Sequence, residues 1–305
     1  MSPFSQPPPS PRDVAVIVST YEKPAWLEKV LWGYAVQSIG EFSLVVADDG
    51  SGEPTRRVIE SAMGAFGGRL THVWRESTGF GKCDILNRAI VASDAEYMIF
   101  TDGDCIPRRD FVETHVHLAE PGRFLSGGVV WLNREGSDEI GRRDIEEGRL
   151  AEPAWMKKRG LGGVRNRLRL TSSRSTAALL DRLTPTRPSF NGHNASVWRS
   201  ALIDVNGFDA EMGYGGLDRA LGERLENLGL RGRQVRHRAV CFHLDHDRPY
   251  RDPDVVRRNR EIRTRIRISG ETRARIGIAE LKPLPSLNRR PGGEAPPSDP
   301  PSARS

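Results

Sequence analysis

The sequence predicts an α/β protein whose central, mostly parallel sheet is flanked by helices. Residues 14–19 and 42–47 are continuous runs of apolar and β-branched residues, which is the pattern of strands buried on both faces of a sheet. Segments with helical spacing alternate with these strand-like runs, and this order favours parallel strands joined by right-handed crossovers. Ligands of such sheets bind beyond the carboxyl ends of the strands.

The first half of the chain supplies its elements in strict alternation. Residues 24–37 carry apolar side chains at helical spacing, and residues 53–63 and 82–92 are also predicted to be helices. Residues 72–75 and 97–101 are predicted to be strands. The second of these two strands ends directly before an acidic triplet, which places carboxylates at the ligand-binding edge of the sheet.

The second half of the chain is less regular. Its predicted elements are a helix at 110–118, a strand at 124–131, ordered structure at 190–199, a helix at 218–228, a strand at 235–242 and a basic helix at 253–268. Residues 134–188 are strongly basic and weakly patterned, and they are too numerous for a plain loop. We therefore expect them to be an insertion that contains some helix.

Composition restricts the class of protein. Of the 305 residues, 37% are hydrophobic and 28% are charged, which is ordinary for a globular chain, and no apolar run is long enough to span a bilayer. The three cysteines, at positions 83, 105 and 241, form no CxxC pair, so we expect neither a disulfide framework nor a structural zinc site. The proline-rich start lacks the features of a secretory signal, and a reducing cytoplasm is the expected location.

The formal net charge of +6 comes from an excess of arginine in residues 142–187 and 248–275. We expect no nucleic-acid partner, because the segments with candidate site residues carry several carboxylates instead. A basic flank suits a phosphate-bearing substrate or an anionic membrane surface equally well. A bias toward arginine in the source would produce the same excess, and the sequence leaves these explanations open.

Asp102 and Asp104 flank a glycine just beyond a predicted strand. Hard divalent cations such as Mg²⁺ or Mn²⁺ take oxygen ligands and bridge to phosphate oxygens. Neutralising a departing diphosphate in this way assists the leaving group. An Asp-Gly-Asp turn is the alternative for the triplet alone, but its position after a strand favours the metal site.

Three further positions have side chains suited to chemistry. Asp218 follows a glycine-rich bend and leads into a predicted helix, which makes it a candidate general base. Asp49 follows a strand and could accept hydrogen bonds from a nucleobase, although it could also cap the next helix. Tyr21 offers a ring on which a base could stack, or it is a core residue at a strand end.

The chain resembles the family-2 glycosyltransferases of the GT-A fold. The resemblance is carried by Val-Ile-Val-Ser-Thr-Tyr at 16–21, Val-Val-Ala-Asp-Asp-Gly-Ser at 45–51 and Phe-Thr-Asp-Gly-Asp at 100–104. Asn-Gly-Phe-Asp at 206–209 and Gly-Tyr-Gly-Gly-Leu-Asp at 213–218 are similar to the acceptor-side segment of galactosyltransferases, polypeptide N-acetylgalactosaminyltransferases and bacterial polysaccharide synthases.

This resemblance covers roughly residues 13–250 apart from the basic insertion, and it implies a Rossmann-like nucleotide-binding half followed by an acceptor-binding half. The implied parts are a disordered tail at 1–12, a nucleotide-sugar half at 13–125, an acceptor and metal half at 126–250 with the insertion at 134–188, a basic helical extension at 251–282 and a disordered tail at 283–305.

The resemblance assigns most of the matching residues to the nucleotide-sugar donor. Ser19, Tyr21 and Asp49 would hold the nucleoside. Lys82 and Arg88 would lie toward the ribose or the diphosphate. The segment Asn191–Gly192–His193–Asn194 would line the donor sugar, with Asn191 and Gly192 as its candidate site residues. Asp102 would face the ribose and the metal, and Tyr214 would sit in a mobile glycine-rich loop that closes on the donor.

The same resemblance assigns the metal and the base. Asp104 would bind the metal directly, and His246 falls where the family has a further metal ligand, with His243 as a second candidate. A neutral imidazole suits Mn²⁺, although a lone surface histidine is the alternative for each. Asp218 matches the catalytic base. Leu217 replaces a glutamate that usually precedes this base, which puts the acceptor type in doubt and predicts a weaker base.

The expected function is therefore an inverting, metal-dependent glycosyltransferase with a UDP-sugar donor. Its acceptor would be a glycan or lipid-linked glycan of a bacterial cell-surface polysaccharide. Residues 155–159, which mix an aromatic with basic residues, would give the cytoplasmic enzyme a peripheral contact with an anionic membrane. A non-catalytic nucleotide-sugar-binding scaffold is the alternative, and a nucleotidyltransferase is disfavoured because no glycine-rich basic loop follows the first strand.

Overall fold

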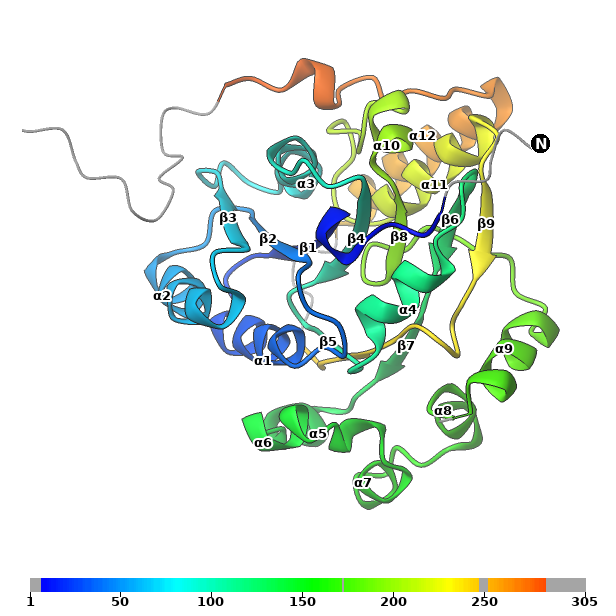
Figure 1. The fold of residues 1–305 in the computed structure, drawn as a ribbon. Coiled ribbons are helices and arrows are strands. Elements are labelled where there is room, and N and C mark those ends of the chain that lie inside the picture. Colours follow the sequence, from blue (N-terminus) through cyan, green and yellow to red (C-terminus); the bar gives the residue numbers. More distant parts are fainter. Residues whose placement is uncertain (1–6, 172, 247–251, 284–305) are drawn as a thin grey trace, which may run out of the picture.

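The structure is a computed structural model that describes residues 7–171, 173–246 and 252–283 (Figure 1). Its central sheet has seven strands in the order β3-β2-β1-β4-β8-β6-β9. The strands are β1 (Val14–Thr20), β2 (Ser43–Asp48), β3 (Leu70–Trp74), β4 (Tyr97–Asp102), β6 (Arg123–Ser126), β8 (Ala195–Trp198) and β9 (Arg231–Gln234). Only β8 runs antiparallel to its neighbours in this sheet of the described chain, so the predicted mostly parallel α/β architecture is confirmed.

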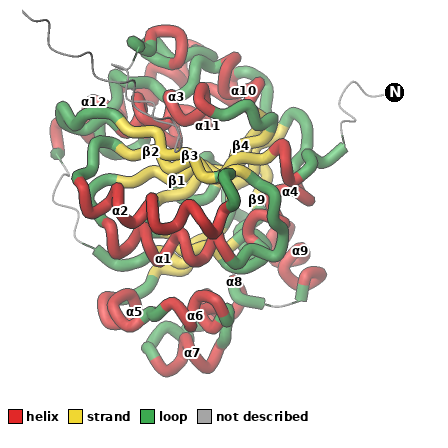
Figure 2. The backbone as a smooth tube through the Cα atoms, turned by 60° about the vertical axis from the view of Figure 1, so that its left-hand side comes forward, coloured by secondary structure: helices red, strands yellow, loops and turns green. Residues whose placement is uncertain are grey.

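Helices cover both faces of the sheet (Figure 2). The helices of the central unit are α1 (Pro24–Ala35), α2 (Glu53–Ala62), α3 (Lys82–Ala92), α4 (Phe111–Leu118), α10 (Arg199–Asp204), α11 (Leu217–Asn227) and α12 (Pro253–Ser269). Alternate residues of β1 serve the two faces: Val16 packs in the core with α1 and α2, while Ile17 packs in the core with α3 and α11. This double burial is the reason for the continuous apolar run in β1.

A second, three-stranded sheet lies beside the first, in the order β5-β10-β7. Its strands are β5 (Cys105–Pro107), β7 (Gly128–Trp131) and β10 (Val240–His243). The antiparallel pairing of β5 with β10 sets Cys105 opposite His243. The residue before β5 and the end of β10 therefore meet, although about 140 residues of chain separate them.

Two predicted strands were wrong in their bounds. The predicted strand at 124–131 is divided between β6 and β7, which belong to different sheets. Residues 235–239 of the predicted strand at 235–242 form a turn, and only residues 240–242 lie in β10. The chain changes sheet at Gly127 and Gly128, where an added Cβ would lie 1.9 Å from the Asn194 amide and 2.0 Å from the Arg236 carbonyl oxygen. Only glycine allows such a close approach, so the apolar run does not continue as one strand.

The basic insertion contains five short helices rather than a loop. They are α5 (Arg134–Glu139), α6 (Arg142–Glu146), α7 (Pro153–Lys158), α8 (Val164–Arg169) and α9 (Arg174–Leu183). Single 3-10 turns lie at Pro11–Asp13, Met63–Phe66, Arg149–Ala151 and Ile278–Glu280. The expected tails at 1–12 and 283–305 lie largely outside the described residues, and none of the described helices is long and apolar enough to cross a membrane.

A buried polar chain joins α4 to the sheet. The Nδ1 atom of His115 lies 2.7 Å from Ser196 Oγ, and its Nε2 atom lies 3.0 Å from Asn194 Oδ1. The hydroxyl of Tyr97 lies 2.7 Å from the same Ser196 Oγ. Because the imidazole is fully buried and has no acidic partner among the described residues, its pKa is lowered to about 4 by burial.

Acidification is expected to destabilise the protein between about pH 6.5 and pH 4. Folded His115 stays neutral down to pH about 4, whereas the unfolded side chain, with a pKa of 6.5, already binds a proton. The unfolded state thus binds more protons in this window, and the free energy of unfolding falls by roughly 3 kcal/mol as the pH falls through it. Urea unfolding at a series of pH values measures this slope.

The matched variants are His115→Gln and His117→Gln, since the His117 side chain is 63% exposed. His115→Gln should flatten the slope in part, because burial also lowers the pKa of His193 to about 4. His117→Gln should leave the slope unchanged. A slope equal to that of the wild type after His115→Gln would contradict the assignment.

Candidate active site

A cleft of about 1300 Å³ opens at the carboxyl ends of β1, β2 and β4. Ten of the thirteen predicted site residues line it, and they come from both sheets and from the start of α11. They are Ser19, Tyr21, Asp49, Lys82, Asp102, Asp104, Tyr214, Asp218, His243 and His246. Arg88, Asn191 and Gly192 are not among the residues that line the cleft.

Asp104, His243 and His246 form a compact group of metal-binding type, with ligand atoms that all lie within 4.8 Å of one another. The Asp104 carboxylate lies 2.7 Å from His246 Nε2 and 3.6 Å from His243 Nε2. Although burial raises the pKa of Asp104, the hydrogen bond from His246 and the nearby imidazole of His243 lower it well below its usual range.

The orientation of His243 suits a cation. Its Nδ1 atom lies 2.7 Å from the carbonyl oxygen of Leu244, which can only accept, so Nδ1 donates this hydrogen bond and Nε2 is the ring nitrogen that faces Asp104. An imidazole nitrogen and a carboxylate that face each other can bind one cation together. One oxygen and two nitrogen donors are an appropriate set for Mn²⁺, so these residues fit the implied metal.

Lys82, at the start of α3, reaches the carboxylate that follows β4. Its Nζ atom lies 2.6 Å from Asp102 Oδ1, and the Ser19 hydroxyl donates to the same oxygen at 2.7 Å. Burial alone would lower the pKa of Lys82, but the charges of Asp102 and Asp218 raise it above its usual value. Lys82 therefore remains an ammonium group in the cleft and is available to a phosphate.

Asp49 is more strongly engaged than the sequence indicates. Its two carboxylate oxygens accept from Arg75 Nε at 2.5 Å and from the Gly81 amide at 2.8 Å. Burial raises the pKa of Asp49 in spite of these bonds. Tyr21 lies at the same end of the cleft with 52% of its surface exposed, so its ring can receive a planar ligand.

Asp218 lies in the first turn of α11, directly after two glycines with left-handed backbone. Gly215 and Gly216 have φ angles of 103° and 86°, which turn the chain into the helix. A Cβ added to Gly192 would lie 2.7 Å from Asp218 Oδ1, so Gly192 shapes the site by letting the carboxylate approach the backbone. Burial raises the pKa of Asp218, and Lys82 opposes the rise.

Leu217 is a core residue in the structure. Its side chain is 5% exposed and packs with the helices that cover this face of the sheet. The missing glutamate was expected to leave Asp218 a weaker base, but burial raises the Asp218 pKa without that second carboxylate. The replacement of the glutamate by Leu217 therefore leaves Asp218 in the cleft with a raised pKa.

Arg88 and Asn191 point elsewhere. Arg88 donates to Asp84 Oδ2 at 2.6 Å and to the carbonyl of Lys282 at 2.9 Å, so it ties α3 to the C-terminal segment instead of facing the cleft. The Asn191 amide oxygen accepts from Ser189 Oγ at 3.3 Å within its own loop. Neither residue lines the cleft in this structure.

The cleft also contains two aromatic residues that the sequence did not single out, together with one member of the predicted donor-sugar segment. His193, Trp131 and Phe80 all line it. Trp131 is 47% exposed and its ring lies 4.2 Å, centroid to centroid, from that of His243. His193 belongs to the predicted donor-sugar segment 191–194, and it is the member of that segment that lines the cleft. Nothing in the sequence distinguishes Trp131 or Phe80 from other exposed aromatics.

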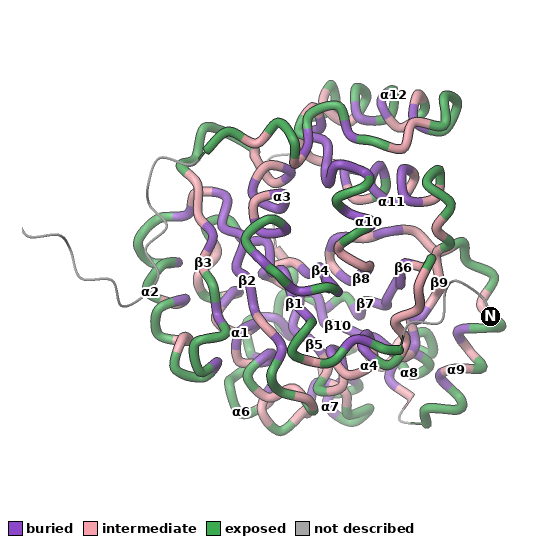
Figure 3. Tube along the Cα trace, turned by 45° about the horizontal axis from the view of Figure 1, so that its top comes forward, coloured by how far each residue is buried: buried purple, intermediate pink, exposed green. Residues whose placement is uncertain are grey.

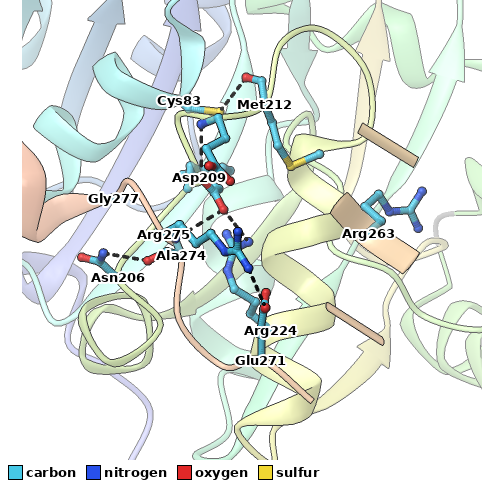
Figure 4. Close-up of polar contacts among 12 residues, drawn as sticks. Cys83, Asn206, Asp209, Met212, Arg224, Arg263, Glu271, Ala274, Arg275 and Gly277 are labelled. Atoms are coloured by element: carbon cyan, nitrogen blue, oxygen red, sulfur yellow. Dashed lines mark hydrogen bonds and ion pairs between the residues drawn. The ribbon is translucent and has the colours of Figure 1, made fainter. Parts of the chain in front are cut away.

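The Asn-Gly-Phe-Asp motif lies behind the cleft and braces α11 (Figure 4). Asp209 and Arg224 are both fully buried and form an ion pair of 3.9 Å. Asp209 also accepts from the Arg275 amide at 3.4 Å, and Arg224 donates to the Gly207 carbonyl at 3.0 Å. The motif thus holds the helix that carries Asp218, and it does not line the cleft.

The structure buries the aromatic side chain of the membrane contact expected at residues 155–159, while Lys157 and Lys158 are exposed. Trp155 is only 7% exposed and packs in the core of the insertion. The guanidinium of Arg159 lies 3.9 Å above the Trp155 ring and pairs with Glu139 at 3.0 Å. An aromatic side chain buried in this way cannot insert into a lipid interface.

The chain is similar in sequence to known proteins. A family model described as "Glycosyl transferase family 2" matches residues 15–205. Validoxylamine A glucosyltransferase from Streptomyces hygroscopicus subsp. jinggangensis (strain 5008) is 24% identical over 231 residues, which cover 71% of this chain and 52% of that protein. The same enzyme of subsp. limoneus is also 24% identical, with 48% of its length covered. The chain spans about half the length of the curated relatives it matches.

Solved structures share the fold. The mannosyltransferase PcManGT from Pyrobaculum calidifontis, in complex with GDP-Man and Mn²⁺, aligns with a TM-score of 0.53 and 23% identity, over 82% of this chain and 62% of that one. Residues 1–349 of S. aureus TarS, in complex with UDP-GlcNAc, align with a TM-score of 0.54 and 17% identity, over 82% and 65% of the two chains. At this level of identity the similarity establishes the fold.

Proposed function

Because this chain belongs to glycosyl transferase family 2, we propose that it is a metal-dependent glycosyltransferase that moves a sugar from a nucleotide-sugar to a hydroxyl group. The observation that carries the proposal is the convergence of three groups in one cleft: the partly buried ammonium of Lys82, the Asp104 cluster and the carboxylate of Asp218. The first two suit a diphosphate, and the third suits a proton acceptor.

The donor is a nucleotide-sugar, with a UDP-sugar as the first candidate and a GDP-sugar as the second. Tyr21 supplies a stacking surface for the base, and Ser19 and Asp102 lie where the ribose of a stacked nucleoside can reach them. Lys82 contributes a positive charge to the diphosphate. The complexes of related structures with GDP-Man and with UDP-GlcNAc support a nucleotide-sugar ligand.

Asp104, His243 and His246 would hold the divalent ion, Mn²⁺ or Mg²⁺. When bound, this ion supplies Lewis-acid stabilisation of the leaving diphosphate. The neutral imidazoles favour Mn²⁺ of the two. The residues of the chain bind the donor so that its anomeric carbon faces Asp218.

Asp218 acts as the general base. Its carboxylate accepts the proton of the acceptor hydroxyl, the hydroxyl oxygen forms a bond to the anomeric carbon, and the bond to the departing diphosphate breaks in the same displacement. A single displacement inverts the anomeric configuration. The raised pKa of Asp218 suits this role, because a base works best when its pKa lies nearer the working pH.

The acceptor is a glycan or lipid-linked glycan of a bacterial cell-surface polysaccharide. The similarity of residues 213–218 to the acceptor segment of galactosyltransferases and N-acetylgalactosaminyltransferases motivates this choice. The exposed ring of Trp131 and the ring of Tyr214, at the cleft, offer apolar faces on which a sugar can stack.

Donor breakdown tests the proposal. Purified protein with Mn²⁺ is incubated with a panel of UDP- and GDP-sugars, and the release of free nucleoside diphosphate is measured. We expect slow hydrolysis of one donor that stops when EDTA is added. Metal-dependent UDP binding without release from any donor would favour the alternative, a non-catalytic nucleotide-sugar-binding scaffold.

A peripheral contact with an anionic membrane is the second part of this proposal, and it lies on α8 and α9. Residues 153–187 contain nine basic residues and one acidic residue, Asp181. Asp181 is buried, where its carboxylate accepts from the His237 amide and from Arg238 Nε. Four large aliphatic side chains of the two helices are exposed between 42% and 72%: Val164, Leu168, Leu179 and Leu183.

These aliphatic side chains project to solvent at i, i+4 spacing on each helix, beside arginines, and Figure 3 shows the exposed stretches of α8 and α9 at one end of the molecule. A short amphipathic helix with a basic flank binds the interface of an anionic bilayer. Contact with a nucleic acid would not favour exposed leucine side chains. The surface therefore replaces residues 155–159 as the proposed membrane contact.

The double variant Leu168→Glu, Leu183→Glu is expected to weaken binding to phosphatidylserine vesicles by about tenfold or more, because it removes two apolar contacts and adds negative charge. Vesicle co-sedimentation measures the binding, with phosphatidylcholine vesicles as the neutral reference. Ile203→Glu, Ile268→Glu is the matched control, since both isoleucines are exposed outside the insertion. Equal losses in the two double variants would contradict the assignment.

A further inference from the structure

One side chain of α12 donates hydrogen bonds to the glycine-rich loop that precedes Asp218. The amide nitrogen of Asn259 lies 3.0 Å from the carbonyl oxygen of Gly213, 3.1 Å from that of Tyr214 and 2.8 Å from that of Gly215. Asn259 is 1% exposed. Three successive carbonyls of a candidate lid therefore converge on one buried NH₂ group.

This convergence fixes how the Asn259 amide is oriented. Carbonyl oxygens accept hydrogen bonds and never donate them, so the nitrogen must face the loop. Three carbonyl dipoles that point to one spot repel each other unless a donor lies between them. A buried donor in that position is worth more than an exposed one, because water does not compete for the bonds.

The loop depends on this contact because it has little conformational preference of its own. Gly215 and Gly216 both have positive φ angles, and glycine visits many other conformations at low cost. The helix packs closely enough to select one of them: a Cβ on Gly213 would lie 2.6 Å from Val255 Cγ1. Figure 3 shows α12 lying over α11.

We propose that Asn259 is a positioning residue, which fixes the loop 213–216 and through it sets Tyr214 and Asp218 in the cleft. The consequence for catalysis rests on the proposed glycosyltransferase function, while the consequence for loop structure does not. Tyr214 lines the cleft from this loop and its ring meets that of Phe80 at 6.1 Å. Asp218 follows two residues after Gly216, so a displaced loop displaces the base.

The chain offers a matched control at the other end of the same helix pair. The Asn227 amide nitrogen, on α11, donates to the carbonyls of Ile266 at 3.0 Å and Glu271 at 2.9 Å. It thus makes the same kind of contact between the same two helices, but away from the cleft. Arg263 and Glu223 pair at 2.6 Å between these two positions and remain intact in all variants.

Hydrogen–deuterium exchange followed by mass spectrometry tests the structural part. Asn259→Ala removes the donor, and Asn259→Asp places an acceptor against three acceptors. We expect amide exchange in peptides that cover residues 210–218 to accelerate by about tenfold or more in both variants, with the β1–β4 peptides unchanged. Asn227→Ala should leave exchange in 210–218 at the wild-type rate. Unchanged exchange in folded Asn259→Ala, or an equal rise in Asn227→Ala, would overturn the proposal.

Kinetics test the catalytic part with the donor that the wild type hydrolyses. Misplacing a catalytic group by about 1 Å can cost roughly 100-fold in rate, so kcat should fall about 100-fold in Asn259→Asp while the KM for the donor changes little. Asn227→Ala should retain wild-type kcat even where its melting temperature falls as much. Equal kcat losses in the two variants would reduce Asn259 to a structural role and overturn its positioning role. If the wild type hydrolyses no donor, the exchange experiment still decides the loop's dependence on Asn259.

Discussion

Replacing Asp218 with asparagine is expected to lower kcat by about 10²–10⁴-fold, which is the usual contribution of a general base. The amide keeps the size of the carboxylate, so it still fits against Gly192 in the first turn of α11, but it cannot accept a proton. Because burial raises the pKa of Asp218, we also expect wild-type kcat to decline as the pH falls through that raised value. Rates of sugar transfer across a pH series measure both effects.

Asp204→Asn is the control for this substitution, since Asp204 is an exposed carboxylate on α10, outside the cleft. It should leave kcat unchanged. Metal-dependent donor binding should also survive in Asp218→Asn, because the Asp104 cluster is intact. Wild-type kcat in folded Asp218→Asn would exclude this residue as the base and shift the assignment toward a binding scaffold.

Most of the parallel part of the fold could be predicted from the sequence. The apolar runs in β1 and β2 are long because helices cover both faces of those strands, and α3 begins and ends at the predicted residues. The division of residues 124–131 between two sheets could not be predicted. It depends on the close approach of Gly127 and Gly128 to residues far along the chain. The strand propensity of residues 124–131 contains no information about such contacts.

The metal cluster was predicted from spacing and family resemblance, and its cause is a strand pairing. The β5–β10 register sets Cys105 opposite His243, which brings Asp104 to the two histidines. The direction of Arg88 is partly readable from the sequence. It lies six residues after Lys82 in one helix, which places the two side chains about 120° apart around α3. It also has Asp84 at i−4 as a ready partner.

The proposed membrane contact shows what composition alone cannot predict. Residues 155–159 have the composition of an interfacial segment. Trp155, however, is buried in the same hydrophobic core as Ile145 and Leu150. The aliphatic residues of α8 and α9 attract no attention in the sequence, because their exposure depends on which face of each short helix packs inward. Burial is a tertiary property that a count of aromatic and basic residues does not contain.

Replacing Asp104 with alanine is expected to abolish metal-dependent donor breakdown. This carboxylate is the oxygen donor that lies with His243 and His246 among the described residues, and its loss leaves those two imidazoles without their carboxylate partner. Stabilisation of a leaving group by a metal is worth several kcal/mol, so the rate should fall by roughly 10²–10⁴-fold. The Mn²⁺ dissociation constant, measured by calorimetry with UDP present, should rise in parallel.

His246→Ala and His117→Ala complete the set for this prediction. His246 lies 2.7 Å from Asp104, whereas His117 is an exposed histidine on α4. We expect His246→Ala to weaken Mn²⁺ binding and to slow donor breakdown, and His117→Ala to do neither. Mn²⁺ affinity that survives in Asp104→Ala and His246→Ala would place the metal elsewhere. Asp218 is unchanged in all three variants. A loss of rate that follows the loss of Mn²⁺ affinity would therefore reflect weaker stabilisation of the leaving diphosphate and not loss of the general base.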